Sequence, residues 1–172
     1  MLRSKTIKFR LVEESDAEFI VSLRTDNKYN QYLSSVSDDV KVQQEWIKHY
    51  KNKEQAKEQF YFIVERLDGT PCGTVRVYDF KGDSFCWGSW ILNENKTRYA
   101  AIESALLVYE FGFGQLGFNK SHFEVVKGNN KVVDFHLKFG AVQTGEDGGH
   151  YYFEISKESV RKTKNKFSRF VK

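Results

Sequence analysis

The chain has 172 residues, a length that suits one domain built on a single hydrophobic core. Hydrophobic residues make up 40% and charged residues 29%, and no run approaches the roughly 20 apolar residues of a membrane-spanning helix. We therefore do not expect a membrane protein. The first residues lack the apolar segment of a secretory signal, so we expect a cytoplasmic protein.

The net charge of +4 is concentrated at the end of the chain. Residues 157–172 contain seven Lys or Arg and one acid, a local charge of +6, whereas residues 1–156 carry −2. We expect one domain over residues 1–156 and a basic tail that is either a helix docking Phe167 and Phe170 or disordered. Ribosome or RNA binding through this tail is a further alternative. Because nucleic acid normally needs a basic face with aromatic platforms, we do not expect it as a partner.

The first half of the chain predicts two helices and four strands. Residues 5–11 alternate between polar and apolar side chains, which is typical of a half-buried strand. A helix capped by Ser15 and Asp16 runs to about Arg24, a polar loop follows, and a second helix begins after Asp39. Three further strands form an antiparallel meander with an Asp-Gly turn, at residues 60–65, 72–80 and 84–92.

The second half predicts alternating helices and strands. Apolar side chains at helical spacing indicate a helix over residues 100–117 that ends at Gly117. Strand 121–126, helix 130–139 and strand 151–155 follow. The order β-α-α-β-β-β-α-β-α-β predicts an α/β fold, with a twisted mixed sheet of six or seven mostly antiparallel strands and helices on both faces. Two cysteines, Cys72 and Cys86, do not have the spacing of a zinc site, so we expect no metal.

Four segments resemble the GCN5-related N-acetyltransferase (GNAT) superfamily, and more narrowly its bacterial branch related to the ribosomal-protein acetyltransferases. They are residues 59–79 with Gly73, residues 90–93, residues 101–118, and a pattern made of Val125, Asn129, Lys138, Gly140 and Ala141. The resemblance covers roughly residues 6–155. It implies an acetyl-CoA-dependent N-acetyltransferase acting on a primary amine. The superfamily often forms dimers, so a homodimer is one option, without a particular interface.

The resemblance also implies where acetyl-CoA binds. Its pyrophosphate would lie where a helix N-terminus favours an anion, at Lys96, Thr97, Arg98, Tyr99, Ala100 and Ala101. Its pantetheine would pair with the strand edge at Trp90, Ile91 and Leu92, whose amides would stabilise the oxyanion. Asn129 would contact the pantetheine arm. The alternative for Asn129 is a plain helix N-cap, and the two roles are compatible.

The phosphate loop departs from the family pattern. The family has Gln or Arg, then Gly, then Gly or Ala at the positions of Lys96, Tyr99 and Ala101, so only the small last residue is kept. Glycine allows the backbone to approach phosphates and permits positive φ. Three interpretations follow: Lys96 and Arg98 supply side-chain contacts, the cofactor binds loosely, or the chain is a non-catalytic acyl-CoA-binding or regulatory module.

Acyl transfer to an amine requires a group that takes up the amine proton and another that protonates the leaving thiolate. His136 occupies the position at which the family often has a Tyr that protonates the thiolate. Its alternative role is that of a half-buried histidine on the inner face of a helix. Glu103 is a second catalytic candidate, although the helix dipole favours a carboxylate there in any protein. His122 and Glu124 share a strand face and would relay a proton from the amine, or lie on a solvated face.

The acceptor is expected to contact Arg24, Tyr29, Tyr32 and Trp87. The loops that would surround it, residues 25–38 and 143–150, hold few acids, which disfavours a polycation. The basic and aromatic residues favour an anionic, ring-bearing small molecule such as a nucleotide-linked amino sugar. An amino sugar without a nucleotide and a peptide amine, such as a protein N-terminus, are the alternatives.

Two tryptophans belong to the same predicted strand. We expect Trp87 and Trp90 on one face of strand 84–92, and Ser89 and Ile91 on the other. The tryptophans would line the acceptor cleft or pack in the core.

Overall fold

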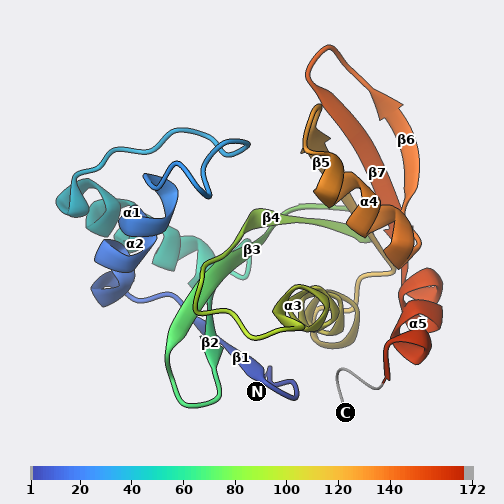
Figure 1. Cartoon of the computed structure of the whole chain (residues 1–172), viewed down its shortest axis with the longest axis horizontal. Coiled ribbons are helices and arrows are strands. Elements are labelled where there is room, and N and C mark those ends of the chain that lie inside the picture. The colour runs from blue at the N-terminus through green and yellow to red at the C-terminus, as the bar shows by residue number, and fades with distance from the viewer. Residues whose placement is uncertain (1, 169–172) are drawn as a thin grey trace.

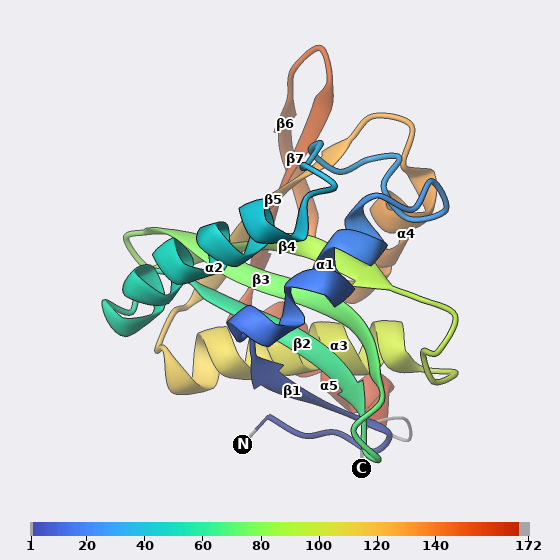
Figure 2. The same ribbon diagram turned by 90° about the vertical axis from the view of Figure 1, so that its left-hand side faces the viewer.

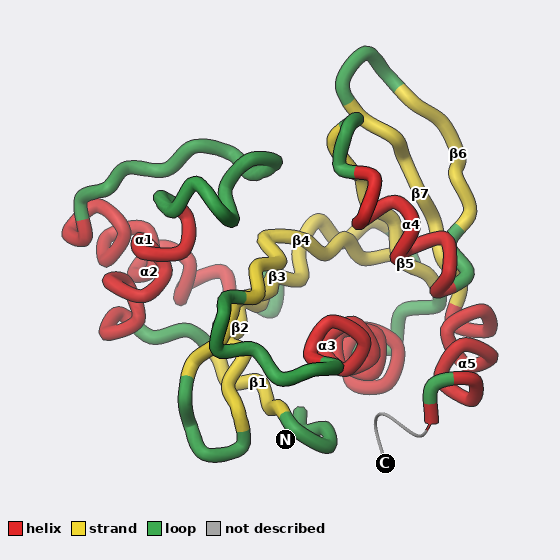
Figure 3. The backbone as a smooth tube through the Cα atoms, viewed as in Figure 1, coloured by secondary structure: helices red, strands yellow, loops and turns green. Residues whose placement is uncertain are grey.

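The computed structural model describes residues 2–168. One sheet of seven strands runs through the molecule in the order β1-β2-β3-β4-β5-β7-β6, and every neighbouring pair is antiparallel except β4 and β5 (Figures 1 and 3). The strands are β1 (Ile7–Leu11), β2 (Phe60–Arg66), β3 (Pro71–Lys81), β4 (Ser84–Leu92), β5 (Lys120–Val126), β6 (Val142–Glu146) and β7 (His150–Ser156). The predicted α/β fold with a mostly antiparallel mixed sheet is confirmed.

Helices cover both faces of this sheet. They are α1 (Ala17–Arg24), α2 (Val40–Gln55), α3 (Ala100–Tyr109), α4 (Asn130–Phe139) and α5 (Lys157–Lys166), with a 3₁₀ turn before α1 and a π-helical segment after α3. Figure 2 shows α1 and α2 in front of the sheet and α3 behind it. Among the described residues, no helix is long and apolar enough to cross a membrane.

The sequence of strand β2 is almost continuously apolar because both of its faces are buried. Tyr61 and Ile63 belong to a hydrophobic cluster with α1 and α2, whereas Phe62 and Val64 belong to the larger cluster on the α3 side. Successive side chains of a strand point to opposite faces, and here both faces are buried. The strand therefore joins the two layers of the core.

Two segments differ from the sequence-based expectation. Residues 143–150 are not a loop, because β6 and β7 form a hairpin over most of them. The apolar alternation that reveals a half-buried strand is absent from β6, which is an edge strand with mostly exposed residues. The helix expected over residues 100–117 changes to a π-helical segment after Tyr109. In that segment a Cβ on Gly112 would lie 2.1 Å from the Phe85 ring, so only glycine allows this close approach.

Residues 157–168 of the basic segment are part of the fold. Helix α5 buries Val160 and Thr163, and the Thr163 hydroxyl donates a hydrogen bond to the Phe139 carbonyl. Phe167 packs on Phe139 with ring centroids 6.0 Å apart, and Phe170 lies outside the described residues. The boundary expected at residue 156 therefore falls within packed structure, because α5 has a buried face despite its charge.

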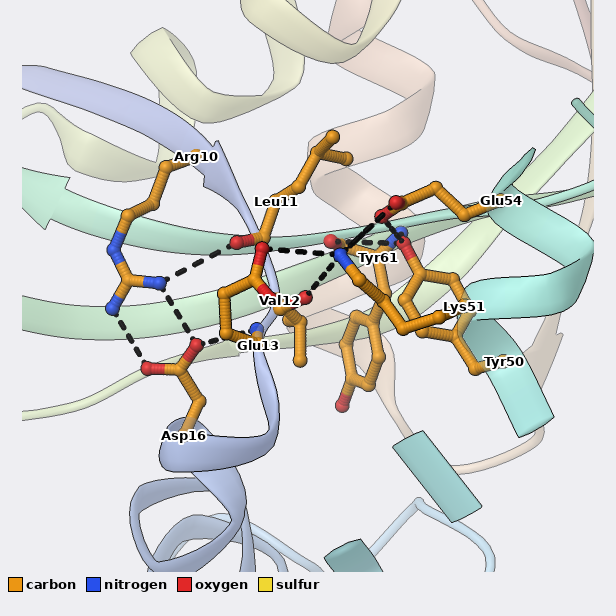
Figure 4. A network of polar contacts seen from close by, with 9 residues as sticks. All are labelled: Arg10, Leu11, Val12, Glu13, Asp16, Tyr50, Lys51, Glu54 and Tyr61. Carbon is orange, nitrogen blue, oxygen red and sulfur yellow. Dashed lines mark hydrogen bonds and ion pairs between the residues drawn. The ribbon is translucent and has the colours of Figure 1, made fainter. Parts of the chain in front are cut away.

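A polar network fixes α2 against the sheet (Figure 4). The Lys51 ammonium donates to the Val12 carbonyl at 2.9 Å and pairs with Glu54 at 3.0 Å. The Tyr50 hydroxyl donates to Glu54 and accepts from the Tyr61 amide, both at 2.7 Å. These bonds hold the helix that follows the loop of residues 25–39, and they thereby fix one end of that loop.

Beside it, Arg10 forms two ion pairs in the same network. Its guanidinium lies 2.7 Å from Asp16 and 2.9 Å from Glu65. Asp16 also accepts the Glu13 amide at 2.8 Å, which starts the 3₁₀ turn before α1. Every charged group named here has a partner within the protein.

Candidate active site

Strands β4 and β5 separate and create the principal cleft. They pair only at Ser84 with Lys120 and at Phe85 with Ser121, so the β4 edge from Cys86 onward has no strand beside it on that side. A cleft of about 570 Å³ lies over this edge, with walls from α1, the loop of residues 25–39, β3, β5 and α4. An open strand edge exposes backbone donors and acceptors to a ligand.

A bulge in β4 shapes the floor of the cleft. Gly88 is opposite Arg76 and Ile91 is opposite Thr74, so two β4 residues face one β3 residue between these pairs. Ser89 has a φ of +48°, a left-handed conformation that is uncommon outside glycine, and its carbonyl accepts the Thr74 hydroxyl at 2.9 Å. Backbone geometry of this kind concentrates at functional sites.

The bulge brings two tryptophans together. Strict alternation would place residues three apart on opposite faces, but the Trp87 and Trp90 rings lie 5.1 Å apart on one face. Trp87 Nε1 donates to the Tyr109 hydroxyl at 3.2 Å and Trp90 Nε1 donates to the Ser104 hydroxyl at 3.1 Å. Both side chains line the cleft and also pack on α3, so the two alternative roles coincide.

His136 lies beneath these rings and lines the cleft. It is 5% exposed rather than half-buried, and its ring lies 4.2 Å from the Phe123 ring and 5.5 Å from the Trp87 ring, between centroids. Burial lowers the pKa of His136 to about 3, so the imidazole is neutral at neutral pH. Its Nδ1 is buried without a hydrogen-bond partner in the described protein.

The loop of residues 25–39 crosses the cleft and is held on both sides. The Tyr29 hydroxyl donates to Glu94, in the connection between β4 and α3. The Tyr32 hydroxyl donates to the Gly128 carbonyl at 3.1 Å, in the connection between β5 and α4. Figure 1 shows the loop reaching across the top of the sheet toward β5. Tyr32 lines the cleft, whereas Tyr29 does not and instead anchors the loop.

Two arginines border the cleft without an acidic partner in the described chain. Arg24 donates from Nη2 to the Ser34 carbonyl at 2.9 Å, and its Nη1 lies 3.4 Å from the Ser89 hydroxyl. The Arg76 guanidinium lies 4.2 Å from the centre of the Tyr78 ring. Neither arginine forms an ion pair within residues 2–168, and the Nε atom of each is buried without a partner.

Sequence reasoning found Arg24 but missed Arg76 and Tyr78. The available signal was a charged residue between Val75 and Val77, both of which are fully buried. Val75 and Val77 face the core, so Arg76 between them points to the opposite face of the strand. Partial burial of its charge there costs free energy, which a favourable contact must offset.

The segment expected to bind pyrophosphate lies at the start of α3, apart from the cleft. Lys96 and Arg98 are exposed, and the Thr97 hydroxyl is 2.7 Å from that of Thr6. Tyr99 is the N-cap residue with a φ of −108°, so this loop needs no left-handed residue where the family has glycine. Ala100, the first residue of α3, is buried, and Ala101 follows it in the first turn. Of the residues expected at the pantetheine, Trp90 and Asn129 line the cleft, and Ile91 and Leu92 do not.

Asn129 is at the N-cap position of α4, but its side chain makes no capping hydrogen bond. Asn129 therefore has the N-cap position that the alternative gave it, without a capping bond from its side chain. Because Asn129 lines the cleft, its amide is available to a ligand there.

Glu103 does not join this site. It is fully buried, accepts the Thr6 amide at 2.8 Å and also accepts the Thr6 hydroxyl, so it ties α3 to the start of β1. The catalytic interpretation is corrected, because both carboxylate oxygens are used inside the fold. The two residues expected to relay a proton, His122 and Glu124, do not lie in the same site. Glu124 lines the cleft, whereas the His122 ring is hydrogen-bonded to Ser84 at 2.6 Å and to Asp79 at 3.0 Å.

Comparison with known proteins identifies the family. A family model described as an acetyltransferase (GNAT) domain matches residues 6–142. The structure of apo FdhC, a nucleotide-linked sugar GNAT, is 54% identical with a TM-score of 0.92, over 99% of this chain and 97% of that chain. No curated protein sequence matches.

More distant structures share the fold alone. Spermidine N-acetyltransferase from Vibrio cholerae, in complex with CoA and spermine, is 17% identical with a TM-score of 0.76, over 90% of this chain and 98% of that chain. Ribosomal-protein-S5-alanine acetyltransferase from Vibrio fischeri is 15% identical with a TM-score of 0.77, over 91% and 96%. The predicted superfamily is confirmed: this chain belongs to the GNAT acetyltransferase family and is an N-acetyltransferase.

Proposed function

We propose that this enzyme transfers the acetyl group of acetyl-CoA to the primary amine of a nucleotide-linked amino sugar. One observation carries the proposal. In the described chain, four buried side-chain nitrogen or oxygen atoms have no partner, and three of them belong to cleft residues: Arg24, Arg76 and His136. Buried polar groups are normally hydrogen-bonded, so these residues hold bonding capacity that the fold does not use.

The two arginines favour an anionic acceptor. A guanidinium is always charged and matches the oxygens of phosphate with paired donors. A polyamine would be repelled by two positive side chains that no carboxylate neutralises. A nucleotide-linked sugar carries a negative diphosphate, and FdhC, which is 54% identical, is a nucleotide-linked sugar GNAT. Charge and similarity therefore support the same class of acceptor.

The chain also has features that fit acetyl-CoA, the acetyl donor used by this family. The open β4 edge offers backbone groups to the pantetheine, and the first turn of α3 offers amide donors to the pyrophosphate. Exposed Lys96 and Arg98 flank that turn. The negative φ of Tyr99 means that this position does not need the positive φ that glycine permits. Bound at these residues, acetyl-CoA would supply an activated thioester.

The remaining chemistry falls to residues of the cleft. Amides at the β4 bulge, near Trp90, would stabilise the oxyanion of the tetrahedral intermediate. Glu124 would accept the proton of the attacking ammonium. Neutral His136 is a poor base because of its low pKa, and we assign it the role of hydrogen-bond donor to the leaving sulfur, from its Nε2. The buried Nδ1 would then stay unprotonated.

The test is a comparison of acceptors with the purified protein. Acetyl-CoA is supplied with a nucleotide-linked amino sugar, spermidine or a peptide with a free N-terminus, and released thiol and acetylated product are measured. We expect turnover with the nucleotide-linked sugar at least tenfold above the others. Preference for spermidine or peptide would contradict the proposal. Binding of acetyl-CoA with no acetylated amine would favour the non-catalytic module instead. A cytoplasmic location and a homodimer stay predictions.

A further inference from the structure

A small side pocket adjoins the principal cleft. It has a volume of about 130 Å³ and shares four wall residues with the cleft, namely Arg24, Ser34, Arg76 and Ser89. Its other walls come from α2, the start of β2 and the loop before α2. Because they share these residues, the side pocket and the cleft belong to the same site.

Both unpaired arginines stand at the boundary between the two spaces. Ser34 holds Arg24 by two bonds of 2.9 Å from the same Nη2, to its carbonyl and to its hydroxyl. Arg76 is held by aromatic faces, with its guanidinium 4.2 Å from the Tyr78 ring and 5.9 Å from the Trp46 ring. Stacking occupies the flat face of a guanidinium and leaves its N–H edge free for an oxyanion.

The inner end of the side pocket has aromatic and amide walls. Trp46 is 38% exposed, and its ring is stacked on Tyr50 at 5.7 Å and contacts Tyr61 edge-on. Gln43 is 8% exposed, and its side-chain amide forms no hydrogen bond among residues 2–168. Tyr50 stacks on the Trp46 ring and the Arg76 guanidinium lies 5.9 Å from its centre, so a base would contact the exposed edge of the indole. A primary amide offers one acceptor and two donors to the edge of that base. No acidic residue lines this pocket.

We infer that this side pocket binds the nucleoside diphosphate end of the acceptor, an inference that rests on the proposed function. The diphosphate lies between Arg24 and Arg76, and the base lies against Trp46 and Gln43. The sugar then extends into the larger cleft, and its amine reaches the side of β4 where His136 and Glu124 lie. Because the side pocket is small, a single-ring base fits better than a purine.

Calorimetric titration of the full chain with free UDP, dTDP, ADP and GDP tests this inference without acetyl transfer. We expect UDP or dTDP to bind at least tenfold more tightly than ADP and GDP. Arg76→Gln and Trp46→Leu should each weaken that binding tenfold or more, and Trp46→Phe should retain most of it. Arg161→Gln is the matched control, since this exposed arginine of α5 pairs with Glu158 and should bind as the wild type does. Melting curves show that each variant is folded.

The outcomes separate the two proposals. Failure of UDP and dTDP to bind at millimolar concentration, equal binding of purine nucleotides, or unchanged binding by Arg76→Gln and Trp46→Leu overturns the side-pocket inference. If pyrimidine nucleotides bind as expected but no nucleotide-linked amino sugar is acetylated, the pocket stands and the proposed function fails. If the sugar is acetylated and both variants keep the wild-type KM, the function stands and the pocket inference fails.

Discussion

Two groups of charged and polar side chains on this sheet differ in how they are paired. Around Arg10 and Lys51 each charged group has a partner in the protein (Figure 4). In the cleft, Arg24, Arg76 and His136 each keep a buried nitrogen without a partner in the described chain. A closed network stabilises the fold, whereas residues with unpaired polar groups at a cleft are available to a ligand. The difference separates residues that serve stability from residues that serve function.

The largest effect is expected at His136. His136→Phe should lower kcat for acetyl transfer about 100-fold, because a hydrogen bond to the leaving sulfur is lost. The melting temperature should not fall, because the new ring would lie among aromatic neighbours without a buried polar atom. Steady-state kinetics and melting curves measure both, with His49→Phe on the exposed face of α2 as control. A kcat within threefold of the wild type would remove His136 from the mechanism.

Breaking the closed network should affect stability and leave catalysis unchanged. Asp16→Ala removes two hydrogen bonds from Arg10 and one from the Glu13 amide, and should destabilise the fold by about 2–3 kcal/mol. Urea unfolding at pH 7 measures this change, and kcat/KM should stay within twofold. Glu45→Ala, which breaks an exposed pair with Lys48, should cost less than about 0.5 kcal/mol. Equal costs for the two variants would contradict the comparison.

His136 in the cleft and Asp16 in the closed network should each make stability depend on pH, in different pH ranges. His136 has its pKa lowered from 6.5 to about 3, so between these values the unfolded chain is protonated and the folded chain is not. Stability should therefore fall by about 1.4 kcal/mol for each pH unit below 6.5. His136→Phe should flatten this slope, as measured by urea unfolding from pH 7 to pH 4.5. A variant slope equal to that of the wild type would show that other groups cause the loss.

Asp16 should act only at lower pH. Burial raises the pKa of Asp16, but hydrogen bonds from Arg10 and the Glu13 amide lower it by more than burial raises it. The net pKa is therefore below the ordinary value of 3.8. The stability that it contributes is complete above about pH 4 and is lost as the pH falls through the folded pKa. Asp16→Asn should therefore leave the slope between pH 6.5 and 4.5 unchanged. A flatter slope in that range would assign part of it to Asp16.

A small effect on stability is expected at Arg76. Arg76→Gln breaks no ion pair and loses only the aromatic contacts with Tyr78 and Trp46, so the free energy of unfolding should change by about 1 kcal/mol or less. Urea unfolding of this variant beside Asp16→Ala compares the unpaired and the paired group directly. A loss as large as that of Asp16→Ala would mean that Arg76 is a structural residue.

Much of the fold was predictable because its signals are local. The meander of β2, β3 and β4 follows from apolar runs and an Asp-Gly turn, and α4 ends at Gly140, whose φ is +106°. Strand β6 gave no such signal, because an exposed edge strand needs no apolar alternation. Glu103 was misassigned because the first turn of a helix favours a carboxylate, whatever that carboxylate contacts.

By itself the sequence determined the order of the elements apart from β6 and α5, the two-sided core and the acetyltransferase family, since these depend on periodicity and on motifs within short segments. Only the tertiary structure decided which side chains share the site. Arg24, Arg76 and His136 are far apart in the chain and meet because the sheet register, the β4 bulge and the separation of β4 from β5 place them around one cleft. This arrangement depends on the pairing of strands that are far apart in the sequence, and the residue pattern within one short segment does not predict that pairing.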